Sequence, residues 1–148
     1  MHRVAVILDA GAEDFQTARS EVEGLLRDSA LEYRILPVHM GGRRAWSRFN
    51  SKEGVVSRND FSHGKPMSEA VDGFCAWPCD ALVALPSEGG DILNHIVKES
   101  KAALKLGRKE VLGELADIGI GTPGGETAAP QTLVLKQALH VLKSLIWK

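Results

Sequence analysis

The chain has 148 residues, of which 44% are hydrophobic and 25% charged, and its 18 basic and 19 acidic side chains give a net charge of −1. This composition excludes a wholly disordered chain and a bulk polycation, so a surface for nucleic acid would have to be local. The length suits one domain, and we predict that residues 1–148 form a single α/β domain. The chain has fifteen glycines, with clusters at 41–42, 89–90 and 119–125, a pattern typical of turns between strands and helices.

The N-terminus and the cysteines bear on the compartment. Residues 4–8 are apolar, but Asp9 ends this run too early for a signal sequence, and no run approaches the roughly 18 residues of a membrane span. Cys75 and Cys79 are too few for a disulfide scaffold, and we expect two buried thiols. The pattern predicts a soluble, cytoplasmic protein with no membrane partner, and it is also compatible with an organellar matrix.

The first 38 residues predict a strand, a helix and a second strand. The β-branched run at 4–8 is typical of a strand buried on both faces. Apolar residues recur at helical spacing over 14–28, and 33–38 again resembles a strand. This order indicates a βαβ unit or a closely related one.

The rest of the chain continues the alternation after a basic segment, 40–66, that has little pattern. We predict a helix over 67–74 and a strand over 81–85. Asp91 suits an N-cap, and the helix that it opens is expected to end at Gly107. A strand at 118–121 and a last helix from Pro130 complete a three-layer α/β/α sandwich, with a mainly parallel sheet of four to six strands.

Two short motifs are better explained as turns than as functional sites. Residues 119–124 match G-x-G-x-x-G, but one helix alone follows and Pro123 removes a backbone donor, so a tight turn is favoured over a dinucleotide site. Ser87 lacks one glycine of a nucleophile elbow and is interpreted as a turn serine. No pattern indicates a metal site or a cofactor.

Positive charge is concentrated late in the chain. Residues 91–109 hold five basic and two acidic side chains, and Lys98, Lys101 and Lys105 would share one face of the predicted helix. Such a face can contact phosphates, and a solvated helix face explains it equally well. The residues predicted to bind nucleic acid are Arg43, Arg44, Arg48, Lys98, Lys101, Lys105, Arg108 and Lys109.

Read in order, residues 3–148 resemble the bacterial-type peptidyl-tRNA hydrolases. That family opens with a strand and N-P-G-x-x-Y-x-x-T-R-H-N, where this chain has D-A-G-A-E-D-F-Q-T-A-R-S at 9–20. The family's I-G-I-G-x-P-G turn is present at 118–124. The resemblance implies a related α/β fold and a chemistry that cleaves the ester between a peptide and tRNA with a histidine base.

The residues that the family uses for catalysis are replaced. Arg19 stands in the place of the histidine, and a guanidinium cannot act as a general base because it stays protonated. Asp9 and Ile92 replace two asparagines, and the orienting aspartate is missing after Leu85. We therefore expect a catalytically degenerate module that binds RNA or belongs to a ribonucleoprotein assembly, such as an organellar ribosome.

Two alternatives remain open. The opening turn also resembles hydrogenase maturation proteases, amidotransferase-like proteins of the PfpI type and aminoimidazole ribonucleotide mutases, so an enzyme with altered chemistry in a strand-end cleft is the first. Its candidate residues are Asp9, Glu13, Arg19, His39, Glu88 and His95. The second is a protein-interaction domain with an apolar patch around Trp46 or Trp147.

Overall fold

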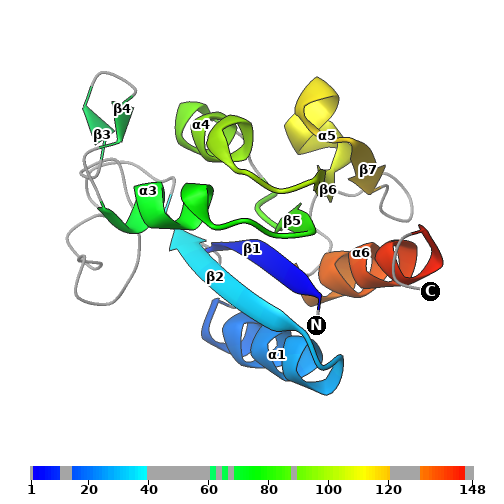
Figure 1. Cartoon of the computed structure of the whole chain (residues 1–148). Helices are drawn as coiled ribbons and strands as arrows, with labels where there is room; N and C mark the ends of the chain where they lie inside the picture. Colours follow the sequence, from blue (N-terminus) through cyan, green and yellow to red (C-terminus); the bar gives the residue numbers. More distant parts are fainter. Residues whose placement is uncertain are drawn as a thin grey trace.

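Five parallel strands form the central sheet of this computed structural model (Figure 1). The structure describes residues 2–10, 15–39, 61–62, 65–66, 69–87, 90–120 and 131–145. In spatial order the strands are β2 (Glu32–Val38), β1 (Arg3–Asp9), β5 (Ala81–Ala84), β6 (Leu104–Arg108) and β7 (Ile118–Ile120).

Helices cover both faces of this sheet, which gives the predicted three-layer α/β/α arrangement. Figure 1 shows α1 (Phe15–Asp28) and α6 (Gln131–Leu145) on one face. The other face carries α3 (Glu69–Ala76), α4 (Asp91–Glu99) and the short α5 (Lys109–Leu112), followed by a turn of 3-10 helix, η3 (Gly113–Leu115). A small antiparallel pair, β3 (Phe61–Ser62) and β4 (Lys65–Pro66), lies outside the main sheet.

Strand β1 is the centre of two hydrophobic cores. Val4, Val6 and Leu8 pack beneath α1 and α6, whereas Ala5 and Ile7 pack toward α3 and α4. All five side chains are at most 1% exposed, because alternate residues of a strand point to opposite faces and both faces are covered. This double burial explains the continuous apolar run in the sequence.

The chain changes direction across the sheet after β2. It builds β2 on one side of β1, then returns to place β5 on the other side and adds β6 and β7 beyond it. This arrangement is one of the common doubly wound orders, and it leaves a topological switch point between the carboxyl ends of β1 and β5.

The predicted helix from Asp91 to Gly107 is wrong beyond residue 99. The helix α4 ends at Glu99, Ser100 is extended, and the chain then forms β6. Leu104 and Leu106 alternate into the core under α6, so sheet packing outweighed a weak helical pattern. Asp91 is not the N-cap either: that position is Gly90, and Asp91 lies in the first turn.

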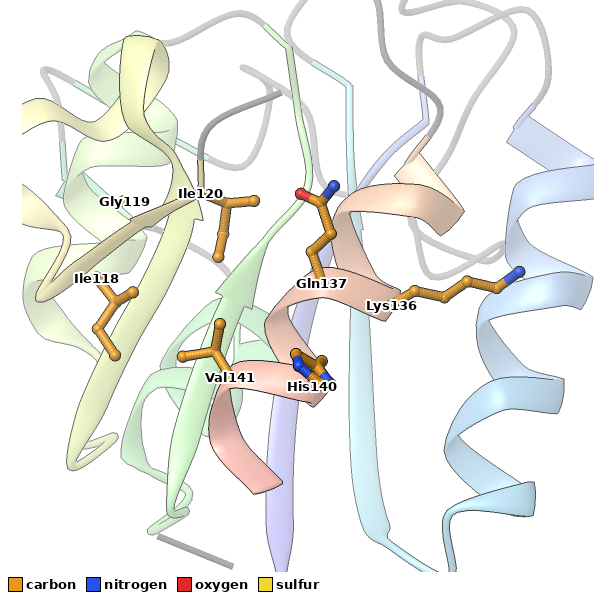
Figure 2. Close-up of a pocket in the computed structure, with 7 residues that line it drawn as sticks. All are labelled: Ile118, Gly119, Ile120, Lys136, Gln137, His140 and Val141. Atoms are coloured by element: carbon orange, nitrogen blue, oxygen red, sulfur yellow. The ribbon is translucent and has the colours of Figure 1, made fainter. Parts of the chain in front are cut away.

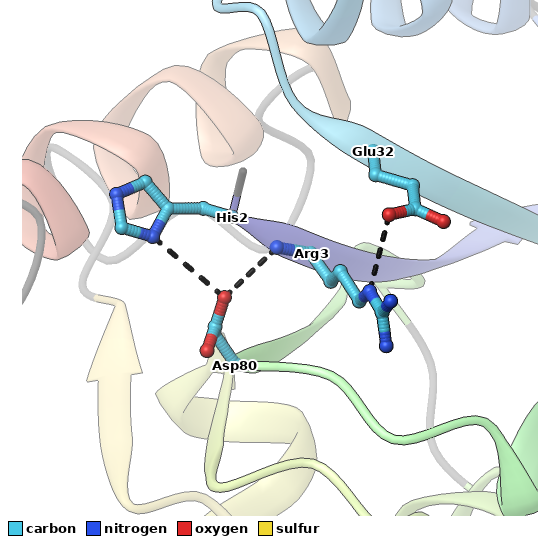
Figure 3. A network of polar contacts seen from close by, with 4 residues as sticks. All are labelled: His2, Arg3, Glu32 and Asp80. Carbon is cyan, nitrogen blue, oxygen red and sulfur yellow. Dashed lines mark hydrogen bonds and ion pairs between the residues drawn. The ribbon is translucent and has the colours of Figure 1, made fainter.

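A polar network joins three segments at the amino edge of the sheet (Figure 3). The backbone N–H of Arg3 donates to Asp80 Oδ2 at 2.8 Å, and His2 Nδ1 lies 3.8 Å from the same oxygen. Arg3 Nε donates to Glu32 Oε2 at 3.1 Å. These side chains are about half exposed, so each ion pair contributes at most about 1 kcal/mol.

Among the helices that the structure describes, none is both long and apolar enough to cross a membrane. The predicted compartment stays a prediction.

Candidate functional site at the carboxyl edge of the sheet

Polar residues stand at the carboxyl ends of four neighbouring strands. Asp9 ends β1, His39 follows β2, Ser87 follows β5 by three residues, and Arg108 ends β6. Because the strands are parallel, all four ends lie at the same edge of the sheet, around the switch point between β1 and β5.

Arg108 is the most unusual residue of this edge. Its side chain is 1% exposed, and Nε donates to the carbonyl oxygen of Leu85 at 3.0 Å, so it reaches across the end of the adjacent strand β5. Burial lowers the pKa of the guanidinium, and the nearby carboxylates of Asp9 and Glu110 act in the opposite direction. A guanidinium stays protonated in proteins, so Arg108 places a permanent positive charge at a dry position.

Gln131 fixes the end of β1. Its Oε1 accepts the backbone N–H of Asp9 at 2.7 Å, and its Nε2 donates to the carbonyl oxygen of Asp9 at 3.4 Å. Gln131 is 4% exposed and opens α6, so these bonds tie the last helix to the first strand. Sequence reasoning missed this residue, for which the start of the helix after Pro130 is the one available signal.

We compared the whole sequence with known protein families. The model of a family of unknown function (DUF6913) matches residues 1–143. The chain belongs to this family. The match includes Asp9, His39, Arg108 and Gln131, so the whole described part of the edge lies within the DUF6913 region. None of the curated proteins matches the chain.

In this DUF6913 chain the predicted catalytic residues divide between the edge and other places. Asp9 is half-buried and His39 is 5% exposed, and both stand at the carboxyl edge, on strands that pair with each other. Glu13 and Glu88 lie outside the described residues. The roles proposed for all four stay predictions.

Arg19 and His95 lie on helices. Arg19 is half-buried on α1, where its Nε is 3.7 Å from Glu23 Oε1. His95 lines a pocket of about 260 Å³ between α3 and α4, together with Asp72, Cys75 and Glu99. The lining of this pocket comes from α3, α4 and Lys101, and it includes neither Asp9 nor Arg108.

The two cysteines are free thiols. Cys75 is buried and its Sγ donates to the carbonyl oxygen of Ile96 at 3.7 Å, whereas Cys79 is half-buried. Burial raises the pKa of both thiols, to about 11 for Cys75, where the carboxylates of Glu99 and Asp72 add to the effect. A thiol with a raised pKa is a poor nucleophile at neutral pH, which fits a structural role. Nowhere in the described ranges do three His, Cys, Asp or Glu side chains form a group that could hold a metal ion.

The predicted basic face is divided between two edges. Lys98 and Lys101 are exposed, on α4 and just after it, and Lys105 is a half-buried strand residue whose Nζ donates to the carbonyl oxygen of Lys98 at 3.4 Å. These three therefore do not share a helix face, and they lie toward the amino end of β6. Lys109 follows the carboxyl end of β6, four residues after Lys105, which is about 13 Å along the strand at about 3.3 Å per residue. Arg108 is buried at that carboxyl end, and Arg43, Arg44 and Arg48 lie outside the described residues.

Proposed function

We propose that the carboxyl edge between β1, β5 and β6 binds a small anionic molecule that carries a phosphate or a carboxylate group. The observation that carries this proposal is the buried guanidinium of Arg108, held by its Nε across the end of β5. A fixed positive charge at the strand ends attracts anions, and a guanidinium forms charge-assisted hydrogen bonds with carboxylate and phosphate groups.

The place in the fold supports the proposal. Open doubly wound sheets bind ligands outside the carboxyl ends of their strands, at the switch point, and Arg108 lies one strand away from it. Gly90, between β5 and α4, has open space around it, so a ligand can approach the backbone closely there. This part of the support is an analogy between folds, and Arg108 supplies the chemistry.

The chemistry assigns different roles to the neighbours of Arg108. A guanidinium has five N–H donors in a planar fork, and the bond from Nε to Leu85 sets the orientation of that plane. The carboxylate of Asp9 acts on the same charge, so an incoming anion competes with it. Gln131 holds the backbone of Asp9 and acts as a positioning residue.

Thermal unfolding in the presence of small anions tests the proposal. The probes are inorganic phosphate, pyrophosphate, a nucleoside triphosphate and succinate. A ligand at one hundred times its Kd stabilises the folded state by about 2.7 kcal/mol, which raises Tm by about 5–10 °C for a chain of this size. We expect at least one probe to do so in the wild type, and the Arg108→Gln variant to lose the shift.

Three variants make this test decisive. Arg27→Gln removes an exposed arginine of α1 and is expected to leave the Tm shift unchanged. Asp9→Asn removes the competing carboxylate and is expected to tighten binding several-fold. Arg108→Lys keeps the charge but loses the fork, so weakened binding by a folded Arg108→Lys protein covers the case in which Arg108→Gln fails to fold. Equal shifts in the wild type and in the Arg108 variants would contradict the proposal.

RNA binding by a degenerate peptidyl-tRNA-hydrolase-like module stays a second candidate. It is favoured by the exposure of Lys98 and Lys101 within three residues of each other. A gel shift with total tRNA at two salt concentrations is expected to show salt-sensitive binding that Lys98→Glu/Lys101→Glu weakens and Arg108→Lys does not. Binding that ignores the lysine variant would remove this surface from consideration.

A further inference from the structure

Two opposite charges are held in place at the carboxyl edge. The bond from Arg108 Nε to the carbonyl oxygen of Leu85, at 3.0 Å, places the guanidinium over the end of β5. The Gln131 side chain binds the backbone N–H of Asp9 at 2.7 Å and its carbonyl oxygen at 3.4 Å, which fixes the end of β1. The edge therefore presents a positive group and a negative group at positions that the strands and α6 set.

The two charges lie about one strand apart. Strand β5 runs between β6 and β1, and the N–H of Leu85 donates to the carbonyl oxygen of Ile7 in β1 at 3.0 Å. Neighbouring strands are about 4.8 Å apart, so a guanidinium over the end of β5 is about that far from the end of β1. Burial lowers the pKa of the Arg108 guanidinium and the Asp9 carboxylate raises it, which agrees with a short separation.

Both groups can bind a ligand in addition to their protein partners. A guanidinium has five N–H donors and no acceptor, whereas a carboxylate has about four acceptor sites and no donor. Arg108 is buried and Asp9 is half-buried, so hydrogen bonds made here are stronger than at an exposed surface. A ligand that satisfies both groups needs an anionic acceptor for Arg108 and a cationic donor for Asp9.

We propose that the anionic group bound by Arg108 is the carboxylate of an α-amino acid, whose ammonium group binds Asp9. This inference rests on the proposed function and names the class of its ligand. An α-amino acid carries both charged groups on one carbon atom, which suits two protein charges about one strand apart. A dianion gains the contact with Arg108 but is repelled by Asp9, whereas the amino acid gains a charge-assisted hydrogen bond at each group.

The groove between β7 and α6 lacks such a pair of charges. Figure 2 shows Ile118 and Ile120 of β7 facing Val141 of α6 across a volume of about 440 Å³, while the Lys136 side chain extends away from β7. The described residues that line this groove include no Asp or Glu. Val141→Phe, which fills the groove, is therefore a control that leaves the proposed ligand site intact.

Derivatives of the same ligands test the proposal on the wild-type protein. The probes are alanine, glutamate, lysine and phenylalanine as free amino acids. Each is compared with its N-acetyl derivative, which lacks the positive charge, and its α-carboxamide, which lacks the negative one. We expect isothermal titration calorimetry to show that at least one free amino acid binds at least tenfold more tightly than both of its derivatives. Equal affinity of the free amino acids and their N-acetyl derivatives overturns the proposal.

The variant Asp9→Asn is expected to act in opposite directions on two kinds of ligand. It weakens the free amino acid at least tenfold, because the ammonium group loses its partner, and it tightens succinate several-fold, because a repulsion disappears. Arg108→Lys is expected to weaken both ligands. Asp28→Asn removes an exposed carboxylate at the last residue of α1, and we expect this variant and Val141→Phe to change either affinity less than twofold.

The outcomes separate this inference from the proposed function. Binding of succinate or phosphate that depends on Arg108, without binding of any of the four amino acids, overturns the inference alone. So does an amino acid that binds Asp9→Asn as tightly as the wild type. Failure of every probe to bind the wild type contradicts the proposed function and this inference together. The comparison of derivatives needs no variant, so it decides the question even if Asp9→Asn fails to fold.

Discussion

The thiol of Cys75 lies beneath α4, next to the carboxylates of Glu99 and Asp72. Burial and these two charges both disfavour the thiolate, and they raise the pKa of Cys75 from its ordinary 9.0 to about 11. At this scale the surroundings decide the chemistry, because the same thiol in an exposed loop would react readily.

We predict that Cys75 resists alkylation in the folded protein. Iodoacetamide at pH 8 is expected to modify it at least tenfold more slowly than in the chain unfolded by guanidinium chloride, as mass spectrometry of its peptide would show. Cys79 is the internal comparison, because it is half-buried and is expected to react faster than Cys75. Equal rates for Cys75 in the folded and unfolded chains would contradict the prediction.

The same shift predicts a loss of stability in alkali. In the unfolded chain the thiol loses its proton near the ordinary pKa of 9.0, whereas in the folded chain it keeps that proton to about 11. The folded state therefore binds more protons in this range, and the stabilising contribution is full below the first value and is lost as pH rises through the second. Cys75→Ala is expected to flatten the decline of urea midpoints over this range relative to the wild type.

Gln131 shows how one side chain holds an element in place. It satisfies both backbone groups of Asp9, and 122 residues separate the two in sequence. Gln131→Leu leaves the part-buried N–H of Asp9 without this acceptor and is expected to lower the free energy of unfolding by about 1–2 kcal/mol. The control is Gln137→Leu on the side of α6 facing β7, for which urea denaturation should show a change below about 1 kcal/mol.

At the scale of elements, Gly107 sets how closely α5 packs on β6. A Cβ at this position would overlap Leu112 Cδ1, and it would lie 3.0 Å from Leu112 Cγ and 3.1 Å from the carbonyl oxygen of Ala84. A glycine is needed here for the close approach of a helix and a neighbouring strand, whereas Gly73 in α3 has open space around it.

We predict opposite effects for the same substitution at these two glycines. Gly107→Ala is expected to cost about 1–3 kcal/mol of stability, because the added methyl group overpacks the contact with Leu112. Gly73→Ala is expected to stabilise the protein by about 0.5–1 kcal/mol, because it adds a helix former to an exposed position of α3. Thermal or urea unfolding measures both, and a stabilising Gly107→Ala would show that α5 does not pack as described.

At the scale of the whole molecule, stability is expected to decrease from the centre of the sheet to its margins. Strands β1 and β5 are paired on both sides and buried on both faces, whereas β2 and β7 are the outer strands of the described sheet. Hydrogen exchange is expected to be slowest for the amides of 4–8 and 81–84 and faster for 118–120. Uniform protection across these strands would indicate that β7 is protected as well as the central strands, which would contradict this prediction.

The fold class was readable from the sequence because double burial of parallel strands produces continuous apolar runs. The run at 4–8 predicted β1, and the strands at 33–38 and 81–85 were placed within one residue of β2 and β5. The helix α1 likewise begins one residue after its predicted start. These segments are long or strongly patterned, so local sequence and tertiary packing agree.

The tertiary structure alone decided β6 and the site. Residues 104–108 contain too few apolar positions for their period to distinguish strand from helix, and pairing with β5 and packing under α6 decided the outcome. In the sequence, Arg108 is indistinguishable from the surface cations near it, and its burial beside the end of β5 is a result of the tertiary structure. Gln131 belongs to no sequence motif. Sequence determined the layers of this protein because burial pattern is local, whereas strand order brought Asp9, Arg108 and Gln131 to one edge from positions far apart in the chain.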